Sequence, residues 1–176
     1  MENVRYRNAT PGDALDLVAI GRQSFTETFG HLYRAEDLAI FLENHSLEGW
    51  TKELEDPAFV VRLGELGEKL VAYAKLGPPS LPFEPRGPSI ELRQFYVLQP
   101  WHGTGIAAEL MDWVITEAKA RGAGDLYLSV FEANHRAQRF YARYGFETVG
   151  TYDFKVGNHV DLDYVMRLHL GEAHDG

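Results

Sequence analysis

The spacing of apolar residues predicts helices and a strand hairpin in the first half of the chain. Leu15, Val18 and Phe25 recur at helical spacing after a cap-like turn at residues 10–13, which predicts an amphipathic helix. Two more helices are expected before a pair of strands that turns around residues 64–67. These helices cover residues 35–45 and 47–55, and the expected strands cover residues 4–7, 58–63 and 70–76.

The second half predicts one strand–helix–strand crossover and a closing hairpin. An alternating strand over residues 90–98 ends before Pro100, and Asn134 is placed to cap a later helix. Helices are expected over residues 105–120 and 135–144, and strands over residues 126–131, 146–155 and 159–168. We therefore expect a mixed α/β fold, with a mostly antiparallel sheet of six to seven strands and about four helices. A single domain should cover residues 1–170, followed by a short tail at 171–176.

Composition narrows the functions that such a fold could carry. The 176 residues include 17 basic and 26 acidic side chains, and a formal net charge of −9 argues against nucleic acid as a partner. No run approaches the ~20 apolar residues that cross a bilayer, so no membrane partner is expected. The beginning of the sequence lacks the apolar stretch of a secretory signal, which favours a cytoplasmic location. With no cysteine, disulfides and cysteine nucleophiles are excluded.

Neither a metal site nor a serine hydrolase has support in the sequence. The seven histidines show no His-x-x-x-His pair and no carboxylate partners at metal-ligand spacing. A Gly-x-Ser-x-Gly elbow is also missing. We therefore expect no metal.

A glycine-containing loop at residues 99–108 is the candidate ligand site. Its small residues let the backbone approach a ligand, and free amides at the start of the next helix favour an anion. The structural alternative is a tight turn that needs glycine for conformation only. No Lys-Ser or Lys-Thr follows, which excludes a Walker loop. Residues 103–108 also fit a dinucleotide pattern, with Glu132 as the ribose acid, but the remaining chain is short for a doubly wound sheet.

Two runs of sequence, ELRQFYVLQPWHGTGIA at 91–107 and NHRAQRFYARYGF at 134–146, resemble the GNAT superfamily of acetyl-CoA-dependent N-acetyltransferases. The similarity extends over residues 5–168, and FTETFGHLY at 25–33 resembles the polyamine-acetyltransferase-like branch. The resemblance implies that acetyl-CoA is the cosubstrate and lies in a V-shaped opening between the strand ending at Leu98 and the strand over 126–131. It also implies direct transfer to a primary amine in a ternary complex, and a homodimer as one assembly state.

The family's loop pattern places Gln or Arg where this chain has His102, so the first position departs from the family. Pyrophosphate binding in the family uses mainly backbone amides, and a histidine there could make binding pH-dependent. By resemblance, Val97 pairs with the pantetheine arm, Asn134 contacts its amide region, and the Phe95 or Val97 amide polarises the thioester oxygen. The implied coenzyme-binding residues are Phe95, Val97, His102, Gly103, Thr104, Gly105, Ile106, Ala107, Ala108, Asn134 and Tyr141.

Two residues are the catalytic candidates. A primary amine with a pKa near ~10.4 must lose a proton before attack, and Glu91 matches the position of a glutamate base in one branch of the family. Tyr141 matches the family's tyrosine that protonates the departing thiolate. The structural alternatives are a solvated strand carboxylate for Glu91, with water as the base, and core packing for Tyr141.

The acceptor site is expected between the first two helices and the last hairpin. Phe29, Tyr33 and Glu91 are the candidate substrate residues. Nearby acidic residues could form a mouth for a cationic small molecule or peptide amine, or simply a solvated rim. They are Glu27, Glu36, Asp37, Asp153, Asp161 and Asp163. A protein of another class, a non-catalytic acyl-CoA sensor, would keep the loop without amine chemistry.

Overall fold

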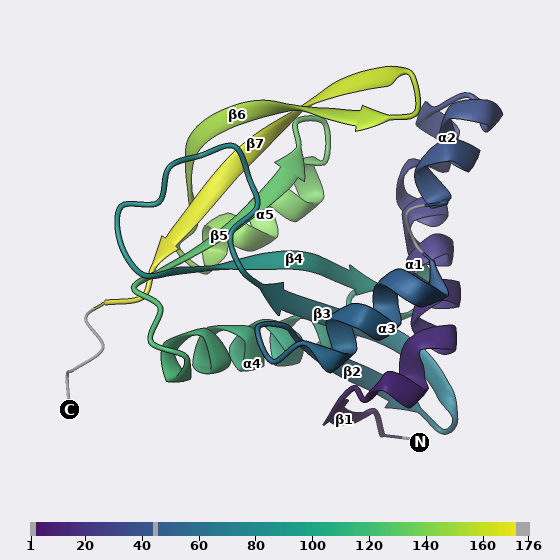
Figure 1. Ribbon diagram of the computed structural model, residues 1–176, viewed down its shortest axis with the longest axis horizontal. Coiled ribbons are helices and arrows are strands. Elements are labelled where there is room, and N and C mark those ends of the chain that lie inside the picture. Colours follow the sequence, from purple (N-terminus) through teal and green to yellow (C-terminus); the bar gives the residue numbers. More distant parts are fainter. Residues whose placement is uncertain (1–2, 44–45, 172–176) are drawn as a thin grey trace.

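The computed structural model describes residues 3–43 and 46–171, and of residues 28, 29, 32 and 41 it describes the backbone alone. These ranges form five α-helices and a seven-stranded sheet (Figure 1). The helices are α1 (Ala14–Phe29), α2 (Ala35–Leu42), α3 (Leu47–Glu55), α4 (Ile106–Ala120) and α5 (His135–Arg143). The strands are β1 (Arg5–Asn8), β2 (Val60–Leu66), β3 (Lys69–Gly77), β4 (Ser89–Val97), β5 (Asp125–Phe131), β6 (Glu147–Val156) and β7 (His159–His169). The predicted mixed fold is confirmed, and the five helices lie where the apolar spacing predicted helices.

The sheet has the order β1-β2-β3-β4-β5-β7-β6. Among the described strands, β4 and β5 form a parallel pair and the other neighbours are antiparallel. A doubly wound dinucleotide fold needs a mostly parallel sheet, so this topology does not fit it. No helix of the described ranges is both long and apolar enough to cross a membrane.

The parallel pair separates soon after it forms. β4 and β5 share a register only from Ser89 opposite Asp125 to Glu91 opposite Tyr127. Beyond this point the two strands diverge, and β5 continues beside β7 (Figure 1). The expected V-shaped opening therefore begins directly after Glu91.

A β-bulge changes the direction of side chains along β4. Lys75 lies opposite Gln94 and Leu76 lies opposite Leu92, so Arg93 is an extra residue without a partner on β3. Because directly opposed residues share a face, Gln94 lies on the same face as Lys75. The extra residue also brings Glu91 to this face, whereas strict alternation would place it on the face of Phe95.

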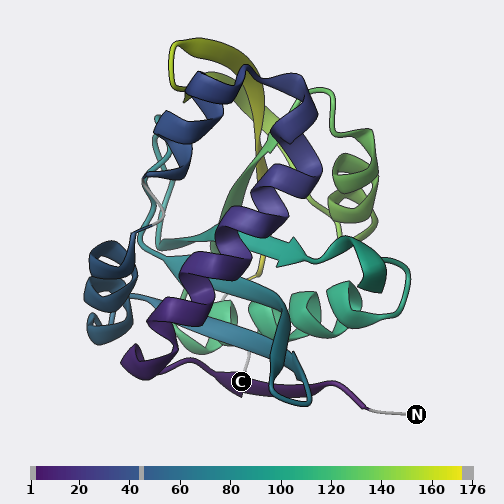
Figure 2. The same cartoon turned by 90° about the vertical axis from the view of Figure 1, so that its right-hand side faces the viewer.

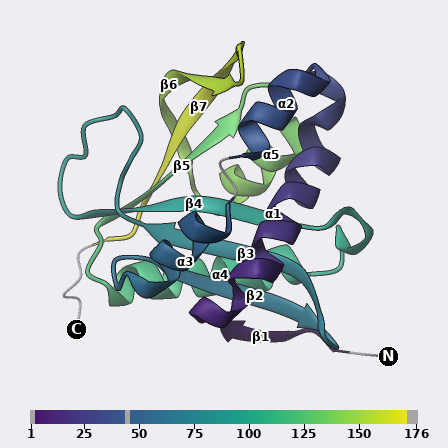
Figure 3. The same cartoon turned by 45° about the vertical axis from the view of Figure 1, so that its right-hand side comes forward.

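Helices cover both faces of the sheet (Figures 2 and 3). On one face, Leu17 and Ile20 of α1 and Trp50 of α3 pack against Tyr73 of β3. On the other face, α4 packs its apolar side against β3, β4 and β5. This packing gives each face of the sheet a buried core, while side chains line the gap between β4 and β5.

The β6–β7 hairpin docks on α2 at its tip (Figure 1). The Asn158 amide donates to Asp37 Oδ1 at 2.9 Å, and Asp37 is buried. Gly157 has φ of 59° and approaches the Asp37 backbone closely. The predicted second helix ends at Leu42, while residues 44–45 and the tail beyond Gly171 lie outside the described ranges.

Candidate active site

The loop from β4 to α4 presents the first amides of α4 to a ligand. Gly103 and Gly105 have φ of 78° and 91°, a conformation that glycine adopts at little cost. The first N–H groups of a helix have no partner within the helix, and together with the helix dipole they favour an anion. The backbone of this loop therefore has the geometry expected of the predicted anion site.

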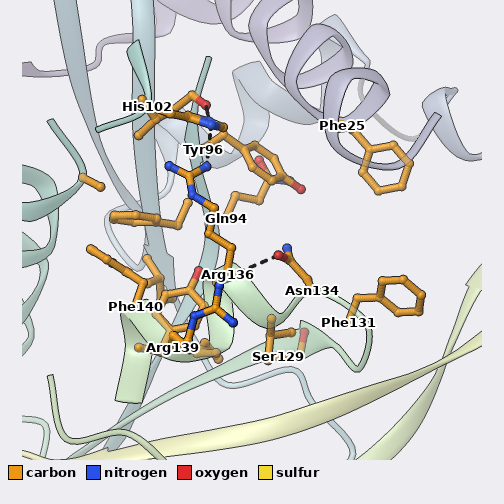
Figure 4. Close-up of a pocket in the computed structure, with 18 of the residues that line it drawn as sticks. Phe25, Gln94, Tyr96, His102, Ser129, Phe131, Asn134, Arg136, Arg139 and Phe140 are labelled. Carbon is orange, nitrogen blue, oxygen red and sulfur yellow. Dashed lines mark hydrogen bonds between the residues drawn. The ribbon is translucent and has the colours of Figure 1, made fainter. Parts of the chain in front are cut away.

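A cavity of about 610 Å³ extends from this loop into the opening between β4 and β5 (Figure 4). β4 contributes Phe95 and Val97 to its wall, and α5 contributes Phe140 and Tyr141. Phe25 of α1 and Tyr33 lie at another part of the same cavity. The cavity thus connects the anion site with side chains from both halves of the chain.

His102 bridges the two sides of the cavity. Its Nε2 lies 2.7 Å from the Val97 carbonyl oxygen, and its Nδ1 lies 2.5 Å from the Arg136 guanidinium on α5. A carbonyl can only accept and a guanidinium can only donate, so the His102 Nε2–H donates to Val97 and its Nδ1 accepts from Arg136. This arrangement corresponds to a neutral imidazole. His102 therefore hydrogen-bonds the carbonyl oxygen of Val97, the residue expected to pair with pantetheine.

Three arginines on α5 add positive charge to the cavity. Arg136, Arg139 and Arg143 follow one another at helical spacing, line the cavity and are exposed at its edge. Sequence reasoning missed them, although their spacing of three and four residues was visible. Guanidinium groups bind phosphate oxygens through paired N–H donors, so this row extends the anion site.

Tyr141 and Asn134 lie deeper in the cavity. Tyr141 is 8% exposed, packs against Phe95 and Phe140, and burial raises the pKa of its hydroxyl well above the ordinary value. Asn134 Oδ1 accepts from the Ala137 amide at 3.3 Å, so Asn134 caps α5 as predicted. This cap uses the carbonyl oxygen of the side chain and leaves its NH₂ group on the cavity side (Figure 4).

Glu91 faces a second, adjoining cavity of about 390 Å³. The carboxylate is 5% exposed, and its Oε1 accepts from Ser80 N at 2.6 Å and from Ser80 Oγ at 2.9 Å. Ser129 of β5 and Gln94 of β4 line both cavities, so the two meet at the opening between the strands. A partly buried ion pair between Lys75 and Glu53, at 2.5 Å, lines the second cavity only.

A cluster of acidic and aromatic residues lies near the start of β7. Tyr33 Oη donates to Asp161 Oδ2 at 2.5 Å, and Asp163 is a buried carboxyl that lines the larger cavity. Burial and the nearby Asp161 charge raise the pKa of Asp163 to about 7. Burial beside Asp163 also raises the pKa of Tyr96 to about 12. A cation entering here would meet an anionic carboxylate and several aromatic rings.

The predicted acidic mouth is only partly assembled by the fold. Asp161 and Asp163 face the cavity region, but Asp37 is buried against Asn158, and Glu27 Oε1 accepts from the Gln99 amide at 3.0 Å. Glu36 and Asp153 are exposed to solvent. The Phe29 side chain lies outside what the structure describes.

Comparison with known proteins identifies the family. The profile described as acetyltransferase (GNAT) family matches residues 19–146. The chain belongs to the GNAT acetyltransferase family. An uncharacterized N-acetyltransferase of Mycobacterium tuberculosis (strain ATCC 25618 / H37Rv) is 35% identical over 155 residues, 88% of this chain and 96% of the relative.

Two solved structures show how widely this GNAT fold is shared. The PaiA N-acetyltransferase from Thermoplasma acidophilum, in complex with coenzyme A, has a TM-score of 0.75 at 18% identity and covers 95% of this chain and 99% of its own. The ribosomal-protein-S18-alanine N-acetyltransferase from Escherichia coli has a TM-score of 0.72 at 15% identity and covers 99% and 98%. At these identities the two structures support the fold of this acetyltransferase and nothing finer.

The fold of this acetyltransferase places most of the predicted coenzyme-binding residues in the lining of the larger cavity. Two residues of the loop do not line it: Thr104 Oγ1 donates to the Trp101 carbonyl, and Ile106 is 3% exposed in the core. Glu91 lines the adjoining cavity, and Tyr33 lines the larger one. Among the described residues no group of three or more His, Cys, Asp or Glu side chains is arranged for a metal ion.

Proposed function

We propose that this GNAT acetyltransferase transfers the acetyl group of acetyl-CoA to a primary amine of a small molecule or peptide, by direct attack in a ternary complex. The observation that carries the proposal is the separation of β4 from β5 after Glu91 and Tyr127. The cavity opened there runs from the amides of α4 to Tyr141. A ligand with an anionic end at the loop can therefore place its other end beside a buried hydroxyl.

The residues of the cavity fit coenzyme A. The α4 amides and the arginine row of α5 would hold its phosphates. The β4 edge beyond Glu91 has left its ladder with β5, so its backbone groups are available to the amides of pantetheine. Because the Val97 carbonyl already accepts from His102, a pantetheine amide would share that oxygen with the imidazole or displace it.

The side chains around the opening supply the proton transfers. Binding both substrates side by side lets the amine nitrogen attack the acetyl carbonyl carbon. Tyr141 then protonates the departing sulfur, and its raised pKa means that the hydroxyl still carries its proton at that point. Two buried carboxyls, Glu91 and Asp163, are available for the proton of the amine. Since Ser80 holds Glu91, a water molecule would have to connect that carboxylate with the nitrogen.

The acceptor that these groups favour is cationic. Asp161 and Asp163 place negative charge beside Tyr33 and Tyr96, and ammonium groups bind both carboxylates and aromatic faces. Polyamines and peptides with a free amino terminus carry such groups.

The deciding experiment measures release of free coenzyme A. Purified protein is incubated with acetyl-CoA and, separately, spermidine, L-lysine and a short peptide with a free amino terminus. Turnover with one of these acceptors supports the proposed function and identifies the acceptor class. Tight acetyl-CoA binding without release of coenzyme A in any reaction would instead favour the non-catalytic sensor.

Replacement of Tyr141 by Phe tests the proposed acid. We expect kcat to fall by roughly 10²-fold, because one positioned proton donor contributes about that much. The Kd of acetyl-CoA, measured by calorimetry, should change little because the ring remains. Tyr144→Phe is the matched control, since Tyr144 is the residue directly after α5 and does not line the cavity. Equal turnover by the two variants would remove Tyr141 from the mechanism.

A further inference from the structure

Asp163 is a buried carboxyl without a full set of hydrogen bonds. It lies on β7 between Phe131 of β5 and Tyr152 of β6, and it is 6% exposed. Its Oδ1 has no hydrogen-bond partner among the described residues, although Asp163 lines the larger cavity. A buried acceptor atom without a partner is costly, so its presence beside a cavity indicates a ligand that donates to it.

Within the described part of the chain, none of the groups that act on the pKa of Asp163 carries a positive charge. The negative charge of Asp163 raises the pKa of three tyrosines: Tyr96 of β4, Tyr152 of β6 and Tyr33 after α1. Asp161, on the same strand as Asp163, raises the pKa of Asp163 through charge repulsion. Ser129 of β5 hydrogen-bonds the carboxyl. A buried carboxylate in this setting lacks the cation that normally accompanies it. The ligand that would complete the site is therefore a cation.

Ser129 and Tyr96 place Asp163 close to the reacting groups. Ser129 lines both cavities and accepts from Tyr152 Oη at 3.2 Å, so it stands where the cavities meet. Tyr96 feels the charge of Asp163, and Tyr141 in turn feels Tyr96. All three side chains line the larger cavity, which also holds the proposed acid Tyr141.

The protonation behaviour of Asp163 suits a base. Burial and, to a smaller extent, the Asp161 charge raise its pKa to about 7, and the Ser129 hydrogen bond opposes the rise. An aspartate with an ordinary pKa near ~3.9 is a weak base toward an ammonium group. A carboxyl that titrates near neutral pH accepts the proton more readily and is still ionised in a large share of molecules.

We propose that Asp163 binds the ammonium group of the acceptor and takes its proton, so that Asp163 rather than Glu91 is the catalytic base. This inference depends on the proposed acetyl transfer. Asp163 Oδ1 accepts one proton from the ammonium, and the freed nitrogen forms a bond to the acetyl carbonyl carbon. The nitrogen releases its second proton to water, the carbon–sulfur bond breaks, and the sulfur takes a proton from Tyr141, which solvent restores.

The test compares pH profiles of Asp163→Asn and Glu91→Gln with the most active amine. In the wild type, kcat/KM should rise with pH through an apparent pKa near 7, because the ionised carboxylate is the active form. Asp163→Asn should lose this rise and lower kcat by about 10²-fold. Glu91→Gln should keep the rise. Asp112→Asn, an exposed carboxylate of α4 outside both cavities, is the matched control.

Ser129→Ala gives a second, directional test that does not remove the carboxyl. Without the Ser129 hydrogen bond the carboxylate is less stable, so the rise in kcat/KM should move to higher pH. Loss of the rise in Glu91→Gln, together with its retention in Asp163→Asn, would overturn the proposal. An unmoved profile in Ser129→Ala would also contradict it.

Acceptor binding separates the role of Asp163 from the proposed function. Calorimetry of spermidine with protein and unacetylated coenzyme A, which cannot react, should show at least tenfold weaker binding in Asp163→Asn at pH 8. If the wild type turns over and Asp163→Asn has the same pH profile, kcat and spermidine affinity, the role of Asp163 is refuted and the proposed function stands. Absence of turnover with every amine refutes the proposed function, and equal spermidine binding in both proteins would then refute the Asp163 site as well.

Discussion

At the scale of single residues, Asp163 and Tyr141 show how burial determines what a side chain can do. Burial disfavours the charged form of both, so it raises the pKa of each. For Tyr141 the result is a hydroxyl that keeps its proton, which suits a proton donor. For Asp163 the result is a carboxyl that titrates near neutral pH, which suits a proton acceptor. The same physical cause thus prepares an acid and a base in one cavity.

The raised pKa of Asp163 predicts a pH-dependent loss of stability. The unfolded carboxyl titrates near ~3.9 and the folded one near 7, so the folded state binds more protons between these values. Wild-type stability should therefore fall from about pH 4 to pH 7 through this group and change no further above it. Asp163→Asn escapes the loss and should be more stable at pH 8 by roughly 2 kcal/mol, allowing for solvent screening.

Urea unfolding of both proteins at pH 4.5 and pH 8 measures this difference. Asp161→Asn is the matched control, because Asp161 accepts from Tyr33 and contacts His159, and its removal sacrifices those contacts. A gain in stability confined to Asp163→Asn is expected. If the wild type were as stable as Asp163→Asn at pH 8, the predicted destabilisation by the ionised Asp163 carboxylate would be wrong.

At the scale of elements, the alternation of apolar residues predicted where the strands lie, but not which face of the sheet every side chain takes. The predicted strand over 90–98 is β4, Ser89–Val97, because branched and aromatic residues alternate there. The bulge at Arg93 left no signal in the sequence, since it depends on pairing with β3. It moves Glu91 to the second cavity. The importance of Asp163 was hidden for the same reason, because its burial arises from β5 and β6 on either side.

The docking of the β6–β7 hairpin on α2 gives a prediction at this scale. A Cβ at Gly157 would lie 2.6 Å from the Asp37 Cα, and Gly157 has φ of 59°. Gly157→Ala should therefore lower the free energy of unfolding by roughly 2 kcal/mol. Because β7 carries Asp161 and Asp163, a displaced hairpin should also raise KM for the amine and leave the Kd of acetyl-CoA unchanged.

Gly67→Ala separates the clash from the backbone cost. Gly67 has φ of 65° in the β2–β3 turn, and a Cβ there would meet nothing within 4 Å. This variant should lose about 1 kcal/mol from the left-handed conformation and keep the wild-type KM. Equal kinetic effects of the two variants would show that contact with α2 does not position the acceptor site.

At the scale of the whole molecule, positive charge is concentrated at the cavity although the chain as a whole is negative. The chain carries −9 overall, and a coenzyme with several phosphates is also strongly negative. Long-range repulsion would weaken binding unless positive charge is concentrated at the cavity. The arginine row of α5 and the amides of α4 provide that concentration, while Asp163 lines the same cavity and Asp161 accepts from its lining residue Tyr33. On the proposed function, the molecule thus separates a site for the coenzyme phosphates from a site for the cationic acceptor.

Arg139→Gln tests this separation. Loss of one guanidinium should raise the Kd of acetyl-CoA about tenfold, as expected for a hydrogen bond to a charged group. The difference between variant and wild type should shrink at high salt, because the contact is exposed and therefore screened. Arg5→Gln changes the net charge equally, but Arg5 lies on β1 and does not line the cavity. If both variants weakened binding to the same extent, the overall charge and not the arginine row would govern coenzyme affinity. A tenfold loss confined to Arg139→Gln, measured by calorimetry at low and high salt, would locate the effect at α5.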